Sequence, residues 1–215
     1  MNSLAAYYFY LLVVFIAFLF SLSTGKNSGA ERKYLSALLL LTLVSEAIAD
    51  ILSSTIRINL AVYHFFNPLQ LCLVALYFNE IIPEFKAKGI GIYISITSVV
   101  LGASNAIWIQ NLKNLNSNFL LFESICIITM SLHMFYYLIR NDEIQAFRNQ
   151  HFWISLVMLL FWSITYTFWG LSNAFDENVL HLIPTLGGLL ATVNILTYSA
   201  LAIIFFLTRK NKLSL

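Results

Sequence analysis

Seven long apolar runs constrain the fold of this chain more than any other feature. They cover residues 4–23, 34–53, 60–79, 90–108, 119–139, 152–171 and 183–207. A bilayer core about 30 Å thick is crossed by roughly 20 helical residues, which is the length of each run. The apolar residues are continuous rather than alternating, which favours helices over the strands of a barrel. The sequence therefore predicts an all-α polytopic membrane protein, with residues 1–215 forming a single seven-helix domain.

The composition is typical of an integral membrane protein. Hydrophobic residues make up 60% of it and charged residues only 10%, against about 25% charged residues in soluble domains. A net charge of +2 from scattered loop residues gives no reason to expect nucleic acid as a partner. Cys72 and Cys126 both lie inside apolar runs, where cysteine behaves as a small hydrophobe. We expect the first run to be a retained span, because it is long and lacks a basic leader.

The distribution of basic residues predicts the orientation. Loops that stay in the cytoplasm carry an excess of Lys and Arg. With an odd number of spans, an outside N-terminus and a cytoplasmic C-terminus place ten basic residues inside and two outside. The ten are Lys26, Arg32, Lys33, Lys86, Lys88, Arg140, Arg148, Arg209, Lys210 and Lys212, and the two are Arg57 and Lys113.

The third run is apolar enough to span a bilayer, yet it carries polar residues at helical spacing. These are His64, Asn67 and Gln70. Polar side chains at membrane depth are costly, so they usually face a partner or a cavity. Pro68 cannot donate a backbone hydrogen bond, and its ring clashes with the carbonyl four residues back. We expect a kink at Pro68 that acts as a hinge beside this polar face.

Other runs place polar groups at a similar depth. Glu46 and Asp50 are four residues apart, so they share a face of the second helix that can meet the third. The predicted ligand-binding set is Glu46, Asp50, His64, Asn67, Gln70, Asn105, Glu123 and Tyr166. Three interpretations remain open: a structural carboxylate–histidine pair, a polar pocket open to the outside, and a metal site. The metal site would use Glu46, Asp50, His64 and either Glu123 or His181, but no zinc-binding spacing such as H-E-x-x-H supports it.

Several known classes of membrane protein are disfavoured. A retinal Schiff base needs a lysine inside the last helix, and 183–207 contains none, so no retinal cofactor is expected. No Gly-x-Ser-x-Gly or Ser-x-x-Lys motif indicates a hydrolase. Transporters often have broken helices in paired halves, and the Pro68 region has no clear counterpart in the second half.

Three short motifs resemble segments of seven-helix membrane proteins that are common in Bacteroidota and have no established activity. They are Tyr63-His64 with Pro68-x-Gln70, Phe122-Glu123-Ser124, and Phe152-Trp153-Ile154. The resemblance implies a multi-pass protein of the bacterial inner membrane. In that family a glutamate often stands at the position of Gln70, so the amide here weakens proposals that need a third carboxylate. Some related modules occur beside histidine kinases, which favours sensing.

The preferred functional hypothesis is a small receptor-like sensory module. A small ligand or a proton would enter an outward-facing pocket between the second, third and fifth helices. The short cytoplasmic loops could contact a cytoplasmic or membrane partner protein. The alternatives are a proton- or solute-coupled transporter and a metal-dependent intramembrane lipid enzyme, with an enzyme the less favoured of these classes.

Overall fold

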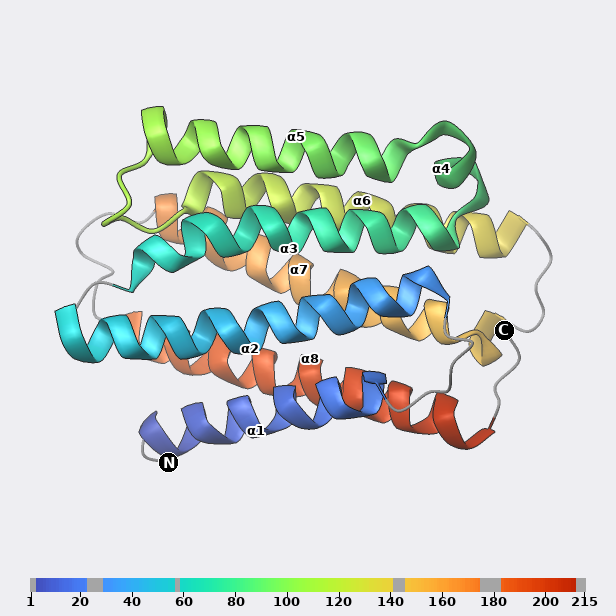
Figure 1. The fold of residues 1–215 in the computed structure, drawn as a ribbon, viewed down its shortest axis with the longest axis horizontal. Coiled ribbons are helices and arrows are strands. Elements are labelled where there is room, and N and C mark those ends of the chain that lie inside the picture. Colours follow the sequence, from blue (N-terminus) through green and yellow to red (C-terminus); the bar gives the residue numbers. More distant parts are fainter. Residues whose placement is uncertain (1–2, 23–28, 57–58, 141–145, 175–182, 212–215) are drawn as a thin grey trace. The chain divides into compact units, whose positions relative to one another are not determined.

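The computed structural model describes residues 3–22, 29–56, 59–140, 146–174 and 183–211 (Figure 1). Within these ranges the regular structure is entirely helical, and seven helices are long and apolar enough to cross a membrane. This confirms the predicted all-α architecture of a multi-pass membrane protein. The helices are α1 (Ser3–Leu22), α2 (Ala30–Ile56), α3 (Leu60–Ile81), α4 (Pro83–Lys88), α5 (Ile90–Ser104), α6 (Ser117–Arg140), α7 (Gln150–Ala174) and α8 (Ile183–Asn211), with short turns η1 (Asn105–Ile109) and η2 (Ala146–Arg148).

The short helix α4 was not predicted, because its six residues are too few and too polar to form an apolar run. Pro83 occupies its first turn, where the missing N–H costs nothing. Gly89 ends it with a φ of 64°, a left-handed conformation that glycine adopts without the usual Cβ clash. The predicted fourth span is one candidate span, Ile90–Ile109, whose last five residues form the π-helical turn η1 directly after α5.

By their internal contacts, the residues group into two compact units. One contains residues 25–130, and the other contains residues 1–24 and 131–215. In the first unit, α2 and α5 both pack against α3. In the second, α8 packs against α1 and α7. The prediction of a single domain stays a prediction.

In the unit of residues 25–130, a row of small residues on α5 meets α3. Gly91, Ser95, Ser98 and Gly102 are all buried and recur every three or four residues, so they lie on one face. Small residues let two helix backbones approach closely within a membrane. A Cβ atom at Gly91 would overlap Asn79 and the carbonyl oxygen of Ala75. The interface therefore depends on the absence of side-chain volume on α5.

In the other unit, aromatic rings connect the helices. The ring centroids of Tyr10 and Tyr198 are 5.7 Å apart, which joins α1 to α8. The rings of Phe20 and Phe206 lie 5.3 Å apart further along the same pair of helices. These separations fall in the range of favourable aromatic contacts. Tyr10 and Phe20 thus contribute to the packing of α1 against α8.

Candidate functional site

The first half of α6 runs in the same direction as α3, and a hydrogen bond fixes their relative register (Figure 1). The side-chain amide of Asn116 donates to the carbonyl oxygen of Tyr63 at 3.4 Å. Each helix rises about 1.5 Å per residue. Gln70 and Glu123 both follow this bond by seven residues, so they lie at about the same depth. We call His64, Asn67, Gln70 and Glu123 the polar layer.

Glu123 is the most unusual member of the polar layer. Its side chain is fully buried, with 0% exposure. Neither carboxyl oxygen has a hydrogen-bond partner among the residues that the structure describes. An isolated ionised carboxylate in apolar surroundings costs far more than a neutral carboxyl group. Among the described residues, this packing therefore supplies no partner that would offset the cost of an ionised Glu123.

Asn67 and His64 lie about one and two turns nearer the start of α3 than Gln70, and both are also buried, at 3% and 2% exposure. One imidazole nitrogen of His64, Nε2, is 3.0 Å from the carbonyl oxygen of Asn114. The other, Nδ1, has no hydrogen-bond partner in the described part of the chain, and the same holds for the amide nitrogen of Asn67. Buried polar groups usually have partners. The polar layer thus retains unused donor and acceptor capacity on both helices.

The predicted carboxylate–histidine pair between α2 and α3 does not form. The hydrogen bond of His64 goes to a backbone carbonyl in the 110–116 loop, while Asp50 is exposed and Glu46 is half-buried on α2. The physical reason is that the loop folds back over the start of α3. A backbone carbonyl leaves no trace in a side-chain pattern, so helical spacing alone could not reveal this partner.

Asn105, predicted as a ligand-binding residue, belongs to a network of amides. Its side-chain nitrogen donates to Asn116 Oδ1 at 2.6 Å and to Gln110 Oε1 at 3.0 Å. The amide of Gln110 in turn donates to Ser117 Oγ at 3.0 Å. Both N–H groups of Asn105 are thereby used. This network holds the loop against the ends of α5 and α6, which is a structural role.

Sequence reasoning did not single out Gln110, Asn114 or Asn116. A signal was present, because Asn and Gln are unusually dense between 105 and 118. The set is Asn105, Gln110, Asn111, Asn114, Asn116 and Asn118. Asparagine favours turns through local side-chain-to-backbone bonds, and a series of them beside a span predicts a folded loop. Recognising that loop would have suggested a partner for His64.

The remaining predicted residues, Gln70, Pro68 and Tyr166, differ from one another in burial and in the unit to which they belong. Gln70 is 8% exposed and completes the polar layer on α3. Pro68 is buried inside α3, which continues on both sides of it. Tyr166 belongs to the unit of residues 1–24 and 131–215, and 42% of its surface is exposed. Arg57 and His181 lie outside the described residues.

A metal centre has no support in the described part of the chain. There, no three side chains among His, Cys, Asp and Glu come together as a metal site would require. The thiol of Cys126 lies about one turn beyond Glu123 on α6 and is half-buried. One thiol beside one carboxyl does not form a ligand set.

Fold and site together define a class: a multi-pass helical membrane protein with a buried layer of acidic, amide and imidazole side chains in one of its units. Compared with known protein families, with curated proteins and with solved structures, the chain matches none.

Proposed function

We propose that the protein is a small sensory membrane module whose polar layer responds to a proton or a very small polar ligand. The observation that carries this proposal is the burial of both Glu123 oxygens without a hydrogen-bond partner in the described structure. Ionisable residues at membrane depth mark functional sites more often than not. A structural carboxylate would be expected to have a cation or several donors around it.

The degree of burial favours a proton over a larger ligand. His64, Asn67 and Glu123 are each at most 3% exposed, which leaves little access for a molecule of several atoms. A proton changes the charge of Glu123 without needing any space. Ionisation in this environment would be costly unless α6 moved or water entered. Protonation therefore selects between two arrangements of the helices, which is what a sensor requires.

The packing around Pro68 supplies a route from Glu123 to its neighbours. Phe119 lies one turn before Glu123 on the same face of α6. A Cβ atom at Gly102 would be 3.5 Å from the Phe119 ring and would overlap the ring of Pro68. Movement of α6 would therefore act on α3 and α5 at the point where α3 lacks a backbone hydrogen bond. In this proposal the Pro68 region is the moving element.

The proposal also includes the membrane in which the protein resides and its orientation there, with the signal passing from the polar layer to the cytoplasmic side. The imbalance of ten basic residues against two supports an outside N-terminus and a cytoplasmic C-terminus. The resemblance to bacterial seven-helix proteins supports the inner membrane. A partner protein at the cytoplasmic loops would read the change in helix packing, because these loops are too short to form a catalytic domain.

The first test measures thermal unfolding of the full chain in lipid nanodiscs from mildly acidic to mildly alkaline pH. In this proposal the folded state holds the Glu123 proton, and loss of the helix packing lets water reach the carboxyl group, which then ionises. Stability should therefore fall as pH rises. Glu123→Gln, which mimics the neutral acid, should flatten this dependence. Asp50→Asn, at an exposed carboxyl on α2, should leave it intact. An unchanged pH dependence in Glu123→Gln would exclude Glu123 as the responding group.

The second test separates sensing from a purely structural role. Spin labels at exposed Phe65 on α3 and Ile125 on α6, with both cysteines replaced by serine, report the distance between the two helices. We expect this distance to change with pH in the wild-type background and to stay fixed in Glu123→Gln. A distance that is constant with pH in both backgrounds would contradict the sensory proposal. Proton flux in proteoliposomes would indicate a transporter instead.

A further inference from the structure

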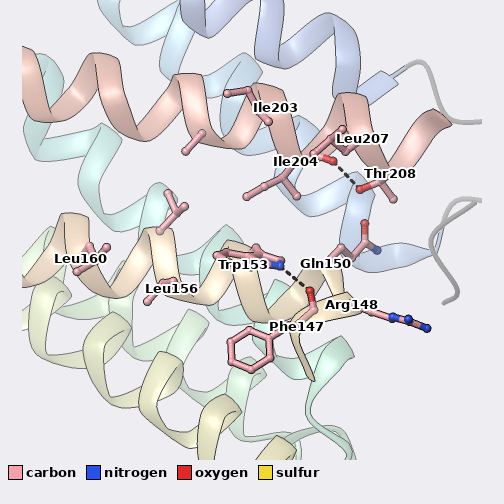
Figure 2. Close-up of a pocket in the computed structure, with 12 residues that line it drawn as sticks. Phe147, Arg148, Gln150, Trp153, Leu156, Leu160, Ile203, Ile204, Leu207 and Thr208 are labelled. Atoms are coloured by element: carbon pink, nitrogen blue, oxygen red, sulfur yellow. Dashed lines mark hydrogen bonds between the residues drawn. The ribbon is translucent and has the colours of Figure 1, made fainter. Parts of the chain in front are cut away.

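A long apolar groove lies between α7 and α8, within the unit of residues 1–24 and 131–215 (Figure 2). Its volume is about 590 Å³. The walls are formed by Trp153, Leu156 and Leu160 of α7 and by Ala200, Ile203 and Leu207 of α8. From Gln150 to Leu160 the groove follows about 15 Å of helix. It therefore has the dimensions of a channel for one extended hydrocarbon chain.

The polar groups of the groove are gathered at one end. Arg148, Gln150 and Thr208 line that end, and the rest of the lining is apolar or aromatic. The candidate span in α7 begins at Gln150, so we place Arg148 where the hydrocarbon core gives way to headgroups. Ile203 and Leu160 are 58% and 56% exposed, which leaves the side of the groove open to lipid. An apolar channel with one polar end at the interface matches an amphiphile.

Arg148 carries the positive charge at the polar end of the groove. It forms no ion pair with any described residue, and Figure 2 shows its guanidinium directed away from the apolar lining. Trp153 Nε1 donates a 2.8 Å hydrogen bond to the carbonyl oxygen of Phe147. This bond holds the turn η2 against α7 and so fixes where the Arg148 side chain begins. Guanidinium groups bind phosphate oxygens through paired hydrogen bonds.

We propose that this groove binds an anionic phospholipid, with one acyl chain between α7 and α8 and the phosphate at Arg148. Charge complementarity selects the anionic class, because the described residues that line the groove include a cation and no acidic side chain. The orientation derived from the basic residues places Arg148 at the cytoplasmic face, where anionic lipids attract basic groups. The site uses other residues than the polar layer, and it shares with the proposed function only the orientation inferred from the basic residues.

The test uses the full-length protein in nanodiscs that contain phosphatidylcholine and phosphatidylglycerol, followed by native mass spectrometry of the lipids retained after transfer to detergent. Wild-type protein should retain phosphatidylglycerol in preference to phosphatidylcholine. Arg148→Gln should reduce that preference about fivefold, the effect of one basic residue at an anionic surface. Lys113→Gln removes an exposed loop cation that does not line the groove, and it should change nothing. Equal retention of both lipids, or an unchanged preference in Arg148→Gln, would overturn the proposal.

A second variant tests the apolar part of the site. Ala200→Phe fills the groove from the α8 side, and it should reduce retention of both lipids while leaving the protein monodisperse and helical. Arg148 is exposed, so its variant remains informative if Ala200→Phe fails to fold. Millimolar inorganic phosphate should not displace the lipid, because the acyl chain contributes most of the contact. Displacement by phosphate would identify a simple anion site and contradict the lipid assignment.

Discussion

Ser98 of α5 donates a 2.7 Å hydrogen bond to the carbonyl oxygen of Pro68 in α3. One turn along, the single hydroxyl hydrogen of Ser95 is shared between the carbonyl oxygen of Cys72, at 3.0 Å, and that of Gly91 in its own helix, at 2.7 Å. Two serines thus bind successive turns of α3, beginning at the residue that interrupts its backbone hydrogen bonds. The α5 helix supports α3 at the depth of the polar layer. Any response of the polar layer to a proton must act against this support.

Replacing Ser98 with alanine should have a small effect on stability. The hydroxyl is fully buried, but Pro68 O can still accept a bond within α3. Hydrogen bonds between membrane helices contribute about 0.6 kcal/mol on average, so we expect Ser98→Ala to lower the free energy of unfolding by about that amount. Ser104→Ala, which removes a bond within α5 to Val100 O, is the control. A loss above about 2 kcal/mol for Ser98→Ala in detergent unfolding would show that the interface has rearranged.

Replacing Gly102 with alanine should cost more than losing the serine bond. A Cβ atom at Gly102 would overlap the ring of Pro68, which is rigid and cannot rotate away. Overpacking of this kind costs about 1–3 kcal/mol. The matched control is Gly187→Ala in α8, because a Cβ there meets no atom within 4 Å. If both glycines tolerate alanine equally in thermal unfolding, the close approach of α5 to α3 does not contribute to stability.

The sequence predicted the membrane-spanning helices well, because the requirement for about 20 apolar residues is strong and local. The spacing of Gly91, Ser95, Ser98 and Gly102 also contained the information for the α3–α5 interface, since small residues at intervals of three and four are typical of close helix pairs. The turn of α4 could not be predicted in this way. Its six residues depend on Pro83 and Gly89 rather than on hydrophobic periodicity.

The candidate site was only partly predictable, for a physical reason. Burial of His64, Asn67 and Glu123 follows from polar groups avoiding lipid, and the structure places all three inside. Which groups they contact depends on the path of the 110–116 loop. That path is fixed by the hydrogen bonds of Asn105 with Asn116 and Gln110, and such pairings within an irregular loop have no periodic signature in the chain.

Removing Asn116 should destabilise the loop network. Its side chain is fully buried and bridges Asn105 to the carbonyl oxygen of Tyr63. Asn116→Ala leaves an Asn105 donor without its closest acceptor, which costs about 1–3 kcal/mol for a buried polar group. Asn118→Ala, at an exposed side chain two residues on, should be nearly neutral. The double variant Asn105→Ala/Asn116→Ala should cost less than the sum of the two single changes; simple additivity would exclude a direct coupling.

The ion pair at α4 predicts a pH effect with a definite sign. Lys86 Nζ lies 2.7 Å from Glu80 Oε2, and this hydrogen bond and the charge of Glu80 raise the pKa of Lys86 above its ordinary value. A raised pKa means that the folded state favours the protonated amine.

The stabilisation that the ion pair gives to the folded state is therefore complete below the ordinary lysine pKa of about 10.4. It is lost as pH rises through the higher pKa of the folded state. Glu80→Gln should lower the Lys86 pKa in an NMR titration of the lysine side chains, whereas Glu84→Gln should leave it unchanged. Added salt should reduce the difference in Lys86 pKa between the wild type and Glu80→Gln, because the pair is exposed and therefore screened. A Lys86 pKa that does not respond to Glu80→Gln would show that the pair does not persist in solution.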